Sequence, residues 1–205
     1  MIAILDYGIG NVRSVLNAFR HLGIDVSLTS DPSLISKSRG LVIPGVGAFG
    51  EGMRRLEEYK IIPVIKSAVS SGMPVLGICL GFQLLMRSSK EHGEHCGLNH
   101  FPLEVERLKV DERLPHIGWG SVHIDQTANQ YSHLLDGLDG ESFYFVHSYC
   151  VPYKPMPYIT ASTIYGEQKF ISSIALGNLF GVQFHPEKSG DTGLKLLKNF
   201  AEIST

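Results

Sequence analysis

Cysteine is scarce in this chain of 205 residues, and the three present, Cys79, Cys96 and Cys150, include no C-x-x-C pair. An odd set without paired spacing argues against a disulfide framework, so we expect a reducing compartment, the cytoplasm. The net charge is only −2 and no basic stripe is present, which argues against a nucleic-acid partner. No apolar run approaches the roughly 20 residues of a membrane helix. The apolar run at the N-terminus breaks at Asp6 without a leading positive charge, which predicts a first strand and not a signal peptide.

What the chain does have is an ordinary globular composition. Hydrophobic residues make up 43% of it, which at this length predicts a single domain over residues 1–205 with a sizeable core. In the first half, apolar strand-like runs alternate with helical patterns. The expected strands are residues 2–5, 25–29, 41–43 and 74–78, and the expected helices are residues 12–22, 53–70 (interrupted near Pro63) and 80–87. This alternation predicts a parallel sheet covered by helices on both faces.

From about residue 95 onward, strands follow one another without helices between them. They are expected at residues 105–108, 121–124, 143–151 and 171–176, before a closing strand at 179–184 and a helix at 193–203. We expect these strands to add antiparallel pairs to the sheet. The predicted fold class is therefore α/β, a three-layer, open, mostly parallel sheet with helices on both faces and antiparallel additions in the C-terminal half.

The sharpest local feature is the sequence VLGICLGFQ at residues 75–83, where an apolar strand runs into Cys79 and a helix starts directly after it. The G-x-C-x-G frame over residues 77–81 is the cysteine form of a nucleophile elbow, in which flanking glycines leave room for a tight turn. A helix N-terminus favours the thiolate, which is the reactive form of cysteine, and backbone N–H groups of the same turn can stabilise an oxyanion. A lone cysteine is more often a buried structural residue. The glycines at a strand-to-helix junction nevertheless favour a catalytic Cys79.

A second candidate, His185, ends a strand in the sequence FGVQFHPE at residues 180–187. Strand ends on one edge of a parallel sheet converge, so we expect His185 to meet Cys79. Glu187 would then hold the imidazole by its other nitrogen and fix its tautomer. Taken alone, this segment would more simply be a capped strand with an exposed histidine. Because a thiol nucleophile needs a base, and the base needs an orienting group, the combination favours a catalytic Cys79, His185 and Glu187.

A third feature is the glycine-rich segment PGVGAFG at residues 44–50. Taken literally, it contains G-x-G-x-x-G, the pattern of a dinucleotide site. It follows the third strand and not the first, however, and Ser70 stands about where the ribose-binding acid is expected. We therefore expect no nucleotide cofactor, and a loop that presents N–H groups to a carbonyl oxygen beside the cysteine.

Four potential metal ligands, His92, His95, Cys96 and His100, lie close together in a polar stretch. Zinc sites use such residues, but this spacing fits no standard zinc pattern and lacks a second pair. We expect a solvated loop here and no metal site.

Together the motifs resemble those of the class I, or triad, glutamine amidotransferases. The signatures of that family are a cysteine elbow, a P-G-x-G loop and an F-H-P-E segment, which stand here at residues 77–83, 44–47 and 184–187. The resemblance implies glutaminase chemistry. Cys79 would form a glutamyl thioester, His185 would deprotonate the thiol and protonate the departing ammonia, and Glu187 would orient His185.

The resemblance also implies an oxyanion hole and a binding site for glutamine. The oxyanion hole would use backbone N–H groups near Val46 or Gly47 and that of Leu80. The residues that would hold L-glutamine are Gln83, Ser148 and Tyr149.

Within the family, the chain resembles glutaminase subunits that pass ammonia to a (β/α)8 barrel cyclase, which makes imidazole glycerol phosphate in histidine biosynthesis. The likeness covers almost the whole chain and includes DYGIGN at residues 6–11, FVHSY at 145–149 and HPEKSG at 185–190. It implies a heterodimer. The residues at family positions that face the barrel are Tyr7, Asn11, Trp119 and Lys188.

Two segments depart from the usual family pattern. Gly120 follows Trp119 where the family usually has asparagine, and residues 92–100 lack the usual glycine-rich Leu-Gly pattern. The alternatives are a paralogous glutaminase that supplies ammonia for amidation of a surface sugar, and a free-standing cysteine hydrolase acting on γ-glutamyl bonds without a partner. A non-catalytic subunit with a relict site is a further alternative, and the intact Cys79, His185 and Glu187 argue against it.

Overall fold

The computed structural model describes residues 1–10, 12–125 and 133–205. Its largest sheet is built around parallel strands, namely β1 (Ile2–Leu5), β2 (Val26–Thr29), β3 (Leu41–Ile43), β4 (Val75–Ile78) and β14 (Leu179–Val182). They lie in the order β2-β1-β3-β4-β14, and each neighbouring pair is parallel. Their carboxyl ends therefore share one edge of the sheet, where open α/β sheets carry their ligand sites.

Antiparallel strands continue the sheet beyond β14. They are β13 (Gln168–Leu176), β12 (Ile159–Tyr165) and β9 (His123–Ile124), in the order β14-β13-β12-β9. Separate small sheets pair β8 (His116–Ser121) with β10 (Ser142–His147), and join β11 (Tyr149–Cys150), β7 (Phe101–Arg107), β5 (Met86–Ser89) and β6 (His95–Cys96). The predicted antiparallel additions are confirmed, but the strands expected at 105–108 and 143–151 belong to these small sheets.

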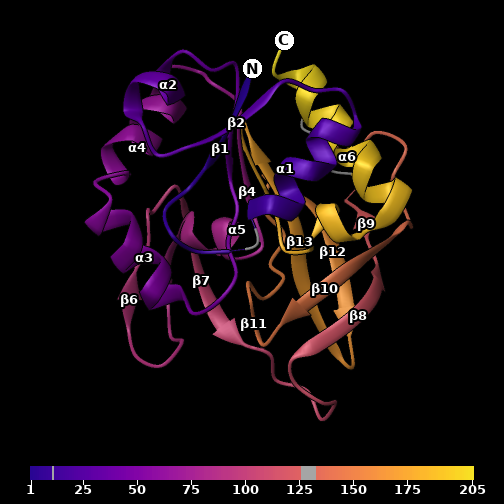
Figure 1. The fold of residues 1–205 in the computed structure, drawn as a ribbon. Helices are drawn as coiled ribbons and strands as arrows, with labels where there is room; N and C mark the ends of the chain where they lie inside the picture. The colour runs from indigo at the N-terminus through magenta and orange to yellow at the C-terminus, as the bar shows by residue number, and fades with distance from the viewer. Residues whose placement is uncertain (11, 126–132) are drawn as a thin grey trace.

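Helices cover both faces of the large sheet (Figure 1). On one face lie α1 (Val12–His21) and α6 (Gly190–Ile203), and on the other α2 (Pro32–Ser36), α3 (Phe49–Glu58) and α4 (Ile62–Ser70). Strand β1 shows why, because its side chains alternate between the faces. Ile2 and Ile4 pack into the core beneath α1 and α6, while Ala3 and Leu5 pack into the opposite core. Among the described residues, no helix combines the length and apolarity needed to cross a membrane.

Several segments differ from the sequence prediction. The interruption expected near Pro63 is confirmed, since residues 53–70 fall in two helices, but α3 begins earlier, at Phe49, and Pro63 stands in the first turn of α4, where its missing N–H costs little. The helix expected over residues 80–87 is shorter, α5 (Leu80–Leu84), because the chain turns at Leu85 and enters β5. Strand β5 pairs with β6 and β7. The apolar run at residues 84–86 suits a helix or a strand, so pairing with distant strands decides its conformation.

Candidate active site

Cys79 stands at the turn between β4 and α5, with φ 52° and ψ −106°. A positive φ is strained for a residue with a side chain. The flanking glycines make the turn possible. A Cβ atom on Gly77 would lie 2.8 Å from the backbone of Gly81, and one on Gly81 would lie 1.8 Å from the carbonyl oxygen of Ile43. The G-x-C-x-G frame is therefore a steric requirement of this strained turn.

His185 and Cys79 meet because their strands are neighbours. Ile78 of β4 pairs with Val182 of β14, and the N–H of Cys79 donates to the carbonyl of Val182 at 2.8 Å. His185 is buried, and its Nδ1 lies 2.8 Å from Oε1 of Glu187, whose side chain is only 3% exposed. Nε2 of His185 makes no hydrogen bond within the described part of the chain. It is thus the nitrogen that is free to exchange a proton with the cysteine.

Two buried histidines near this pocket differ in protonation at neutral pH. Burial alone would lower the pKa of His185, but a Cys79 thiolate and the Glu187 carboxylate outweigh burial and raise the pKa from 6.5 to about 10. Burial lowers the pKa of His147 to about 3, and its Nδ1 lies 2.9 Å from the carbonyl oxygen of Tyr149. At neutral pH, His185 is therefore protonated, while His147 is neutral and keeps a structural bond.

Cys79 opens into a pocket of about 350 Å³ at the carboxyl edge of the large sheet. The residues expected to form the oxyanion hole and to bind glutamine all line it, namely Val46, Gly47, Leu80, Gln83, Ser148 and Tyr149. Glu91, Val146, His147 and Lys188 complete the lining. Sequence reasoning missed Glu91, whose Oε2 accepts a hydrogen bond from the backbone N–H of Phe49 at 2.7 Å. Glu91 follows β5, a strand that was not expected, so no local pattern marked it as a site residue.

A second missed residue, Gln183, lies directly beside the nucleophile. It is fully buried, and its Nε2 lies 3.7 Å from Sγ of Cys79. Its Oε1 accepts a hydrogen bond from Nε2 of Gln83 at 3.0 Å. Gln183 belongs to the same segment as His185, but its contact with Gln83 joins residues 100 positions apart. A local motif therefore could not reveal it.

The glycine-rich loop at residues 44–47 packs against the elbow. The N–H of Leu80 donates to the carbonyl of Gly45 at 3.3 Å, so one of the expected oxyanion donors is already engaged. A Cβ on Gly45 would lie 2.7 Å from the Tyr7 hydroxyl and 2.9 Å from Cβ of Leu80, and Gly47 has φ +111°. The loop needs glycine for close approach at Gly45 and for a left-handed backbone at Gly47.

Tyr7 does not lie on the surface expected to face a partner. Its side chain is fully buried, and its hydroxyl donates to the carbonyl of Pro44 at 2.7 Å. Burial and the nearby Cys79 raise the pKa of Tyr7 above its usual value, so the phenol keeps its proton. The prediction of direct partner contact by Tyr7 was therefore wrong, because this side chain supports the glycine loop from beneath.

Trp119 and Lys188 are exposed, as a partner surface requires. Trp119 of β8 is 59% exposed and stands edge-on to Tyr144 of β10, with ring centroids 6.3 Å apart. Nζ of Lys188 lies 5.7 Å from the centre of the same Tyr144 ring. Tyr144, which the sequence analysis did not single out, thus joins the two into one patch beside the pocket. The remaining predicted partner residue, Asn11, lies outside the described residues.

The histidine-rich stretch, expected to be a solvated loop, is only partly so: His92 and Cys96 are exposed, but His95 and Cys96 form the short strand β6. The ring of His95 fills the space beside Gly50, where an added Cβ would lie 2.6 Å from the imidazole. Within residues 1–10, 12–125 and 133–205, no group of histidine, cysteine and acidic side chains is arranged to hold a metal ion.

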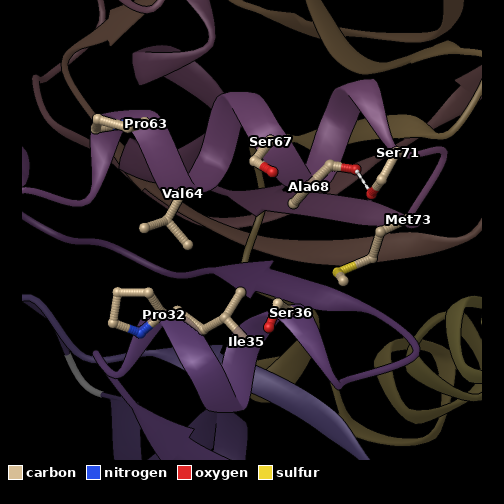
Figure 2. A pocket seen from close by; sticks show the side chains of 9 residues that line it. All are labelled: Pro32, Ile35, Ser36, Pro63, Val64, Ser67, Ala68, Ser71 and Met73. Atoms are coloured by element: carbon tan, nitrogen blue, oxygen red, sulfur yellow. Dashed lines mark hydrogen bonds between the residues drawn. The ribbon is translucent and has the colours of Figure 1, made fainter.

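Another cavity, of about 380 Å³, lies between α2 and α4 (Figure 2). Its lining is mostly apolar with several serines, namely Pro32, Ile35, Ser36, Pro63, Val64, Ser67, Ala68, Ser71 and Met73. The hydroxyl of Ser71 donates to the carbonyl of Ala68 at 2.9 Å. None of these described lining residues is a cysteine, histidine or acid, so the pocket at Cys79 is the stronger candidate for an active site.

Comparison with known proteins decides the family. The profile of the family "Glutamine amidotransferase class-I" matches residues 3–203. The chain belongs to this family. Proteins named "Imidazole glycerol phosphate synthase subunit HisH" are among its relatives. One from Moorella thermoacetica is 45% identical over 98% of this chain and 94% of its own length, and one from Aquifex aeolicus is 46% identical over 96% and 94%.

Solved structures support the fold of this class I glutamine amidotransferase. A crystal structure titled as a glutamine amidotransferase has a TM-score of 0.76 at 19% identity and covers 99% of this chain and 98% of its own. The structure of PurLQS from Thermotoga maritima has a TM-score of 0.74 at 17% identity, with 100% and 98% covered. At these identities the likeness concerns the fold alone.

Gly120, where this amidotransferase departs from the usual pattern, has a packing reason. A Cβ there would lie 3.2 Å from the ring of Phe145 and 3.3 Å from the Thr163 side chain. An asparagine would push against both, so glycine suits the way β8 lies over the aromatic core in this chain.

Proposed function

We propose that this chain is the glutaminase subunit of an imidazole glycerol phosphate synthase. It hydrolyses L-glutamine to glutamate and ammonia, and the ammonia serves a (β/α)8 barrel cyclase in histidine biosynthesis. The observation that carries the proposal is the arrangement of Cys79, His185 and Glu187 at the carboxyl ends of two neighbouring strands. The names of the relatives and their near-complete coverage support the pathway.

The proposed reaction proceeds through a covalent thioester. The Cys79 thiolate, whose proton has passed to Nε2 of His185, attacks the side-chain carbonyl carbon of glutamine. The tetrahedral intermediate collapses as His185 returns the proton to the nitrogen, which leaves as ammonia. Water, deprotonated by His185, then attacks the thioester and releases glutamate and Cys79. Glu187 holds Nδ1 of His185 throughout, at 2.8 Å, and so keeps Nε2 directed at the reaction.

Stabilisation of the oxyanion is proposed to be the regulated step. Its donors would be the N–H groups of Leu80 and of Val46 or Gly47. Because the Leu80 N–H donates to the carbonyl of Gly45, the loop must move before Leu80 can serve the oxyanion. The loss of one oxyanion donor typically costs on the order of a hundredfold in rate. The subunit alone is thus expected to be slow.

Glutamine would be held by groups on the pocket wall. Gln83, Ser148 and Tyr149 line that wall. Because Nε2 of Gln83 is already bonded to the Tyr149 carbonyl and to Gln183, the group of Gln83 that would hold glutamine is its Oε1. Glu91 is the acidic member of the lining, and we assign it to the α-ammonium group of glutamine because an ion pair suits a positively charged group at the mouth of the pocket.

The partner surface is proposed to be the patch of Trp119, Tyr144 and Lys188. Trp119 and Lys188 stand exposed there, and Tyr144 between them is half-buried. Tryptophan and tyrosine are residue types that often dominate binding energy at interfaces. The assembly would be a heterodimer with lyase activity in its cyclase subunit. We place it in the cytoplasm, since Cys79, Cys96 and Cys150 are all free thiols.

The test uses glutamine labelled with ¹⁵N in its side-chain amide. With the cyclase subunit and its ribotide substrate present, the label should enter the ring of imidazole glycerol phosphate even when unlabelled ammonium is in excess. Label that enters an amidated sugar would identify the paralogous role. Label that appears only as free ammonium, at a rate independent of any partner, would identify a free-standing hydrolase.

A further inference from the structure

A buried chain of amide groups connects the wall of the pocket to the nucleophile. Nε2 of Gln83 donates to the carbonyl oxygen of Tyr149 at 2.9 Å and to Oε1 of Gln183 at 3.0 Å. Nε2 of Gln183 in turn lies 3.7 Å from Sγ of Cys79. Gln83 is 4% exposed and Gln183 is 0% exposed, so water has little access to these bonds.

The direction of this chain is set at its outer end. A backbone carbonyl can only accept a hydrogen bond, so Gln83 must turn its NH2 group toward Tyr149. The same nitrogen faces Gln183, which must therefore present its oxygen to Gln83 and its own NH2 group to Cys79. With either amide turned over, two donors or two acceptors would face each other. The sulfur of Cys79 consequently lies opposite a donor and has to accept.

We propose that Gln183 is a positioning residue that stabilises the thiolate form of Cys79, with its polarity fixed through Gln83 by the Tyr149 carbonyl. A hydrogen bond to an ionised acceptor is stronger than the same bond to a neutral one, so this amide favours thiolate over thiol. Unlike an imidazole, an amide N–H keeps its proton at all working pH values. The thiolate is therefore prepared before glutamine binds. This inference rests on the proposed role of Cys79 as nucleophile.

The test measures the thiolate without glutamine or partner. A thiolate displaces iodide from iodoacetamide and forms an S–C bond, so the alkylation rate against pH reports the thiolate fraction. Exposed Cys96 is changed to serine in every variant, and the Cys79 peptide is followed by mass spectrometry. Burial raises the pKa of Cys150 to about 12, so Cys150 does not compete.

Two substitutions remove the donor in different ways. Gln183→Met keeps the length but has no polar atom, and Gln183→Glu still accepts from Gln83 while it replaces the donor with a charge. We expect the midpoint of the alkylation profile to rise by about one pH unit in Gln183→Met, which is a tenfold loss of thiolate on the acidic side. The rise should be larger in Gln183→Glu. The matched control is Gln168→Met, because Nε2 of Gln168 lies 3.8 Å from Sγ of unreactive Cys150, and the Cys79 profile should not change.

The proposal would be overturned by a Gln183 variant that has the same alkylation profile and the same unfolding temperature as the protein with Cys96→Ser alone. If neither Gln183 variant folds, Gln83→Met is the deciding variant. Without Gln83 the Gln183 amide can turn over, so the midpoint of the Cys79 alkylation profile should also rise. A midpoint equal to that of the protein with Cys96→Ser alone would overturn the proposal. The outcome is separable from the proposed function. If the Gln183 variants shift the alkylation profile but the protein never hydrolyses glutamine, the proposed glutaminase function is wrong and the role of Gln183 stands. If the protein hydrolyses glutamine but the alkylation profile does not shift, only the role of Gln183 is wrong.

Discussion

At the scale of single residues, the proposed chemistry depends on one sulfur atom. Cys79 sits on a strained backbone next to a buried, protonated His185. Cys79→Ala should lower partner-activated glutamine hydrolysis by at least about a thousandfold, while the fold is kept because the change is small and local. Glutamate release and thermal unfolding check the two halves of this prediction. Cys96→Ala, at an exposed thiol, should be nearly silent, and more than a few per cent of activity left in Cys79→Ala would remove the assignment.

The charge on Glu187 gives the site a characteristic pH dependence. This carboxylate helps to raise the pKa of His185 to about 10. In Glu187→Gln the shape is kept and the charge is lost, so the pKa of His185 should fall and its proton should be lost at lower pH. We expect the alkaline limb of kcat/KM to move to lower pH, with a smaller rate loss than in His185→Ala.

A control for this prediction exists on the surface. Oδ2 of Asp136 lies 3.2 Å from Nδ1 of exposed His133, so Asp136→Asn removes the same charge beside another histidine. Its pH profile should match that of the unchanged chain. An unmoved alkaline limb in Glu187→Gln would mean that Glu187 does not act through His185.

Residue identities could be predicted where contiguous motifs carry them. Cys79, His185 and Glu187 each stand within a few positions of the glycines or strand that define their place. Gln183 could not be assigned, because its role depends on a contact with Gln83 that exists only after folding. Tyr7 was assigned wrongly to a surface, since its motif does not reveal that the glycine loop covers it.

At the scale of elements, the parallel strands and their helices could be predicted because each strand is a short, mostly apolar run and helical patterns lie between them, although β2 (Val26–Thr29) includes Ser27 and Thr29. Strand β12 could not, because it buries polar residues. Thr160 donates to the Ser173 hydroxyl at 2.8 Å and Thr163 donates to the carbonyl of Ser121 at 3.0 Å. Hydrogen bonds from neighbouring strands satisfy these hydroxyls, so the strand reads as polar in sequence and is buried in the fold.

The glycine loop is the element on which regulation should depend. Gly47 has φ +111°, a backbone that a residue with a side chain adopts poorly, so Gly47→Ala should misplace the oxyanion donors. We expect partner-activated kcat to fall about a hundredfold, the typical cost of one such donor. Gly72→Ala is the matched control, because Gly72 has φ +82° and, like Gly47, has nothing within 4 Å of an added Cβ. Equal losses of activity in the two variants would show that general destabilisation, and not the oxyanion hole, explains the effect.

At the scale of the whole molecule, the active edge of the sheet is also the proposed docking surface. Trp119→Ala should weaken binding of the cyclase by at least about thirtyfold, as expected for a central aromatic anchor, in a calorimetric titration. Lys188→Ala should lower the activation of glutamine hydrolysis by the partner while it leaves the unfolding temperature nearly unchanged. Leu176→Ala provides the control, since Leu176 is 45% exposed at the opposite edge of the sheet, beside the start of β14. Equal binding by the Trp119 and Leu176 variants would contradict this docking surface.

The measurement that tests the account most directly is the steady-state glutaminase rate of the chain alone, with the cyclase, and with the cyclase and its ribotide ligand. In the structure the Leu80 N–H donates to the Gly45 carbonyl, so the chain alone should hydrolyse glutamine slowly or not at all. Rotation of a peptide in the loop at residues 44–47 would free one oxyanion donor or supply another. The liganded complex should therefore be faster than the chain alone by at least about a hundredfold. A full rate from the isolated chain, unchanged by the cyclase, would contradict the account and leave a free-standing hydrolase.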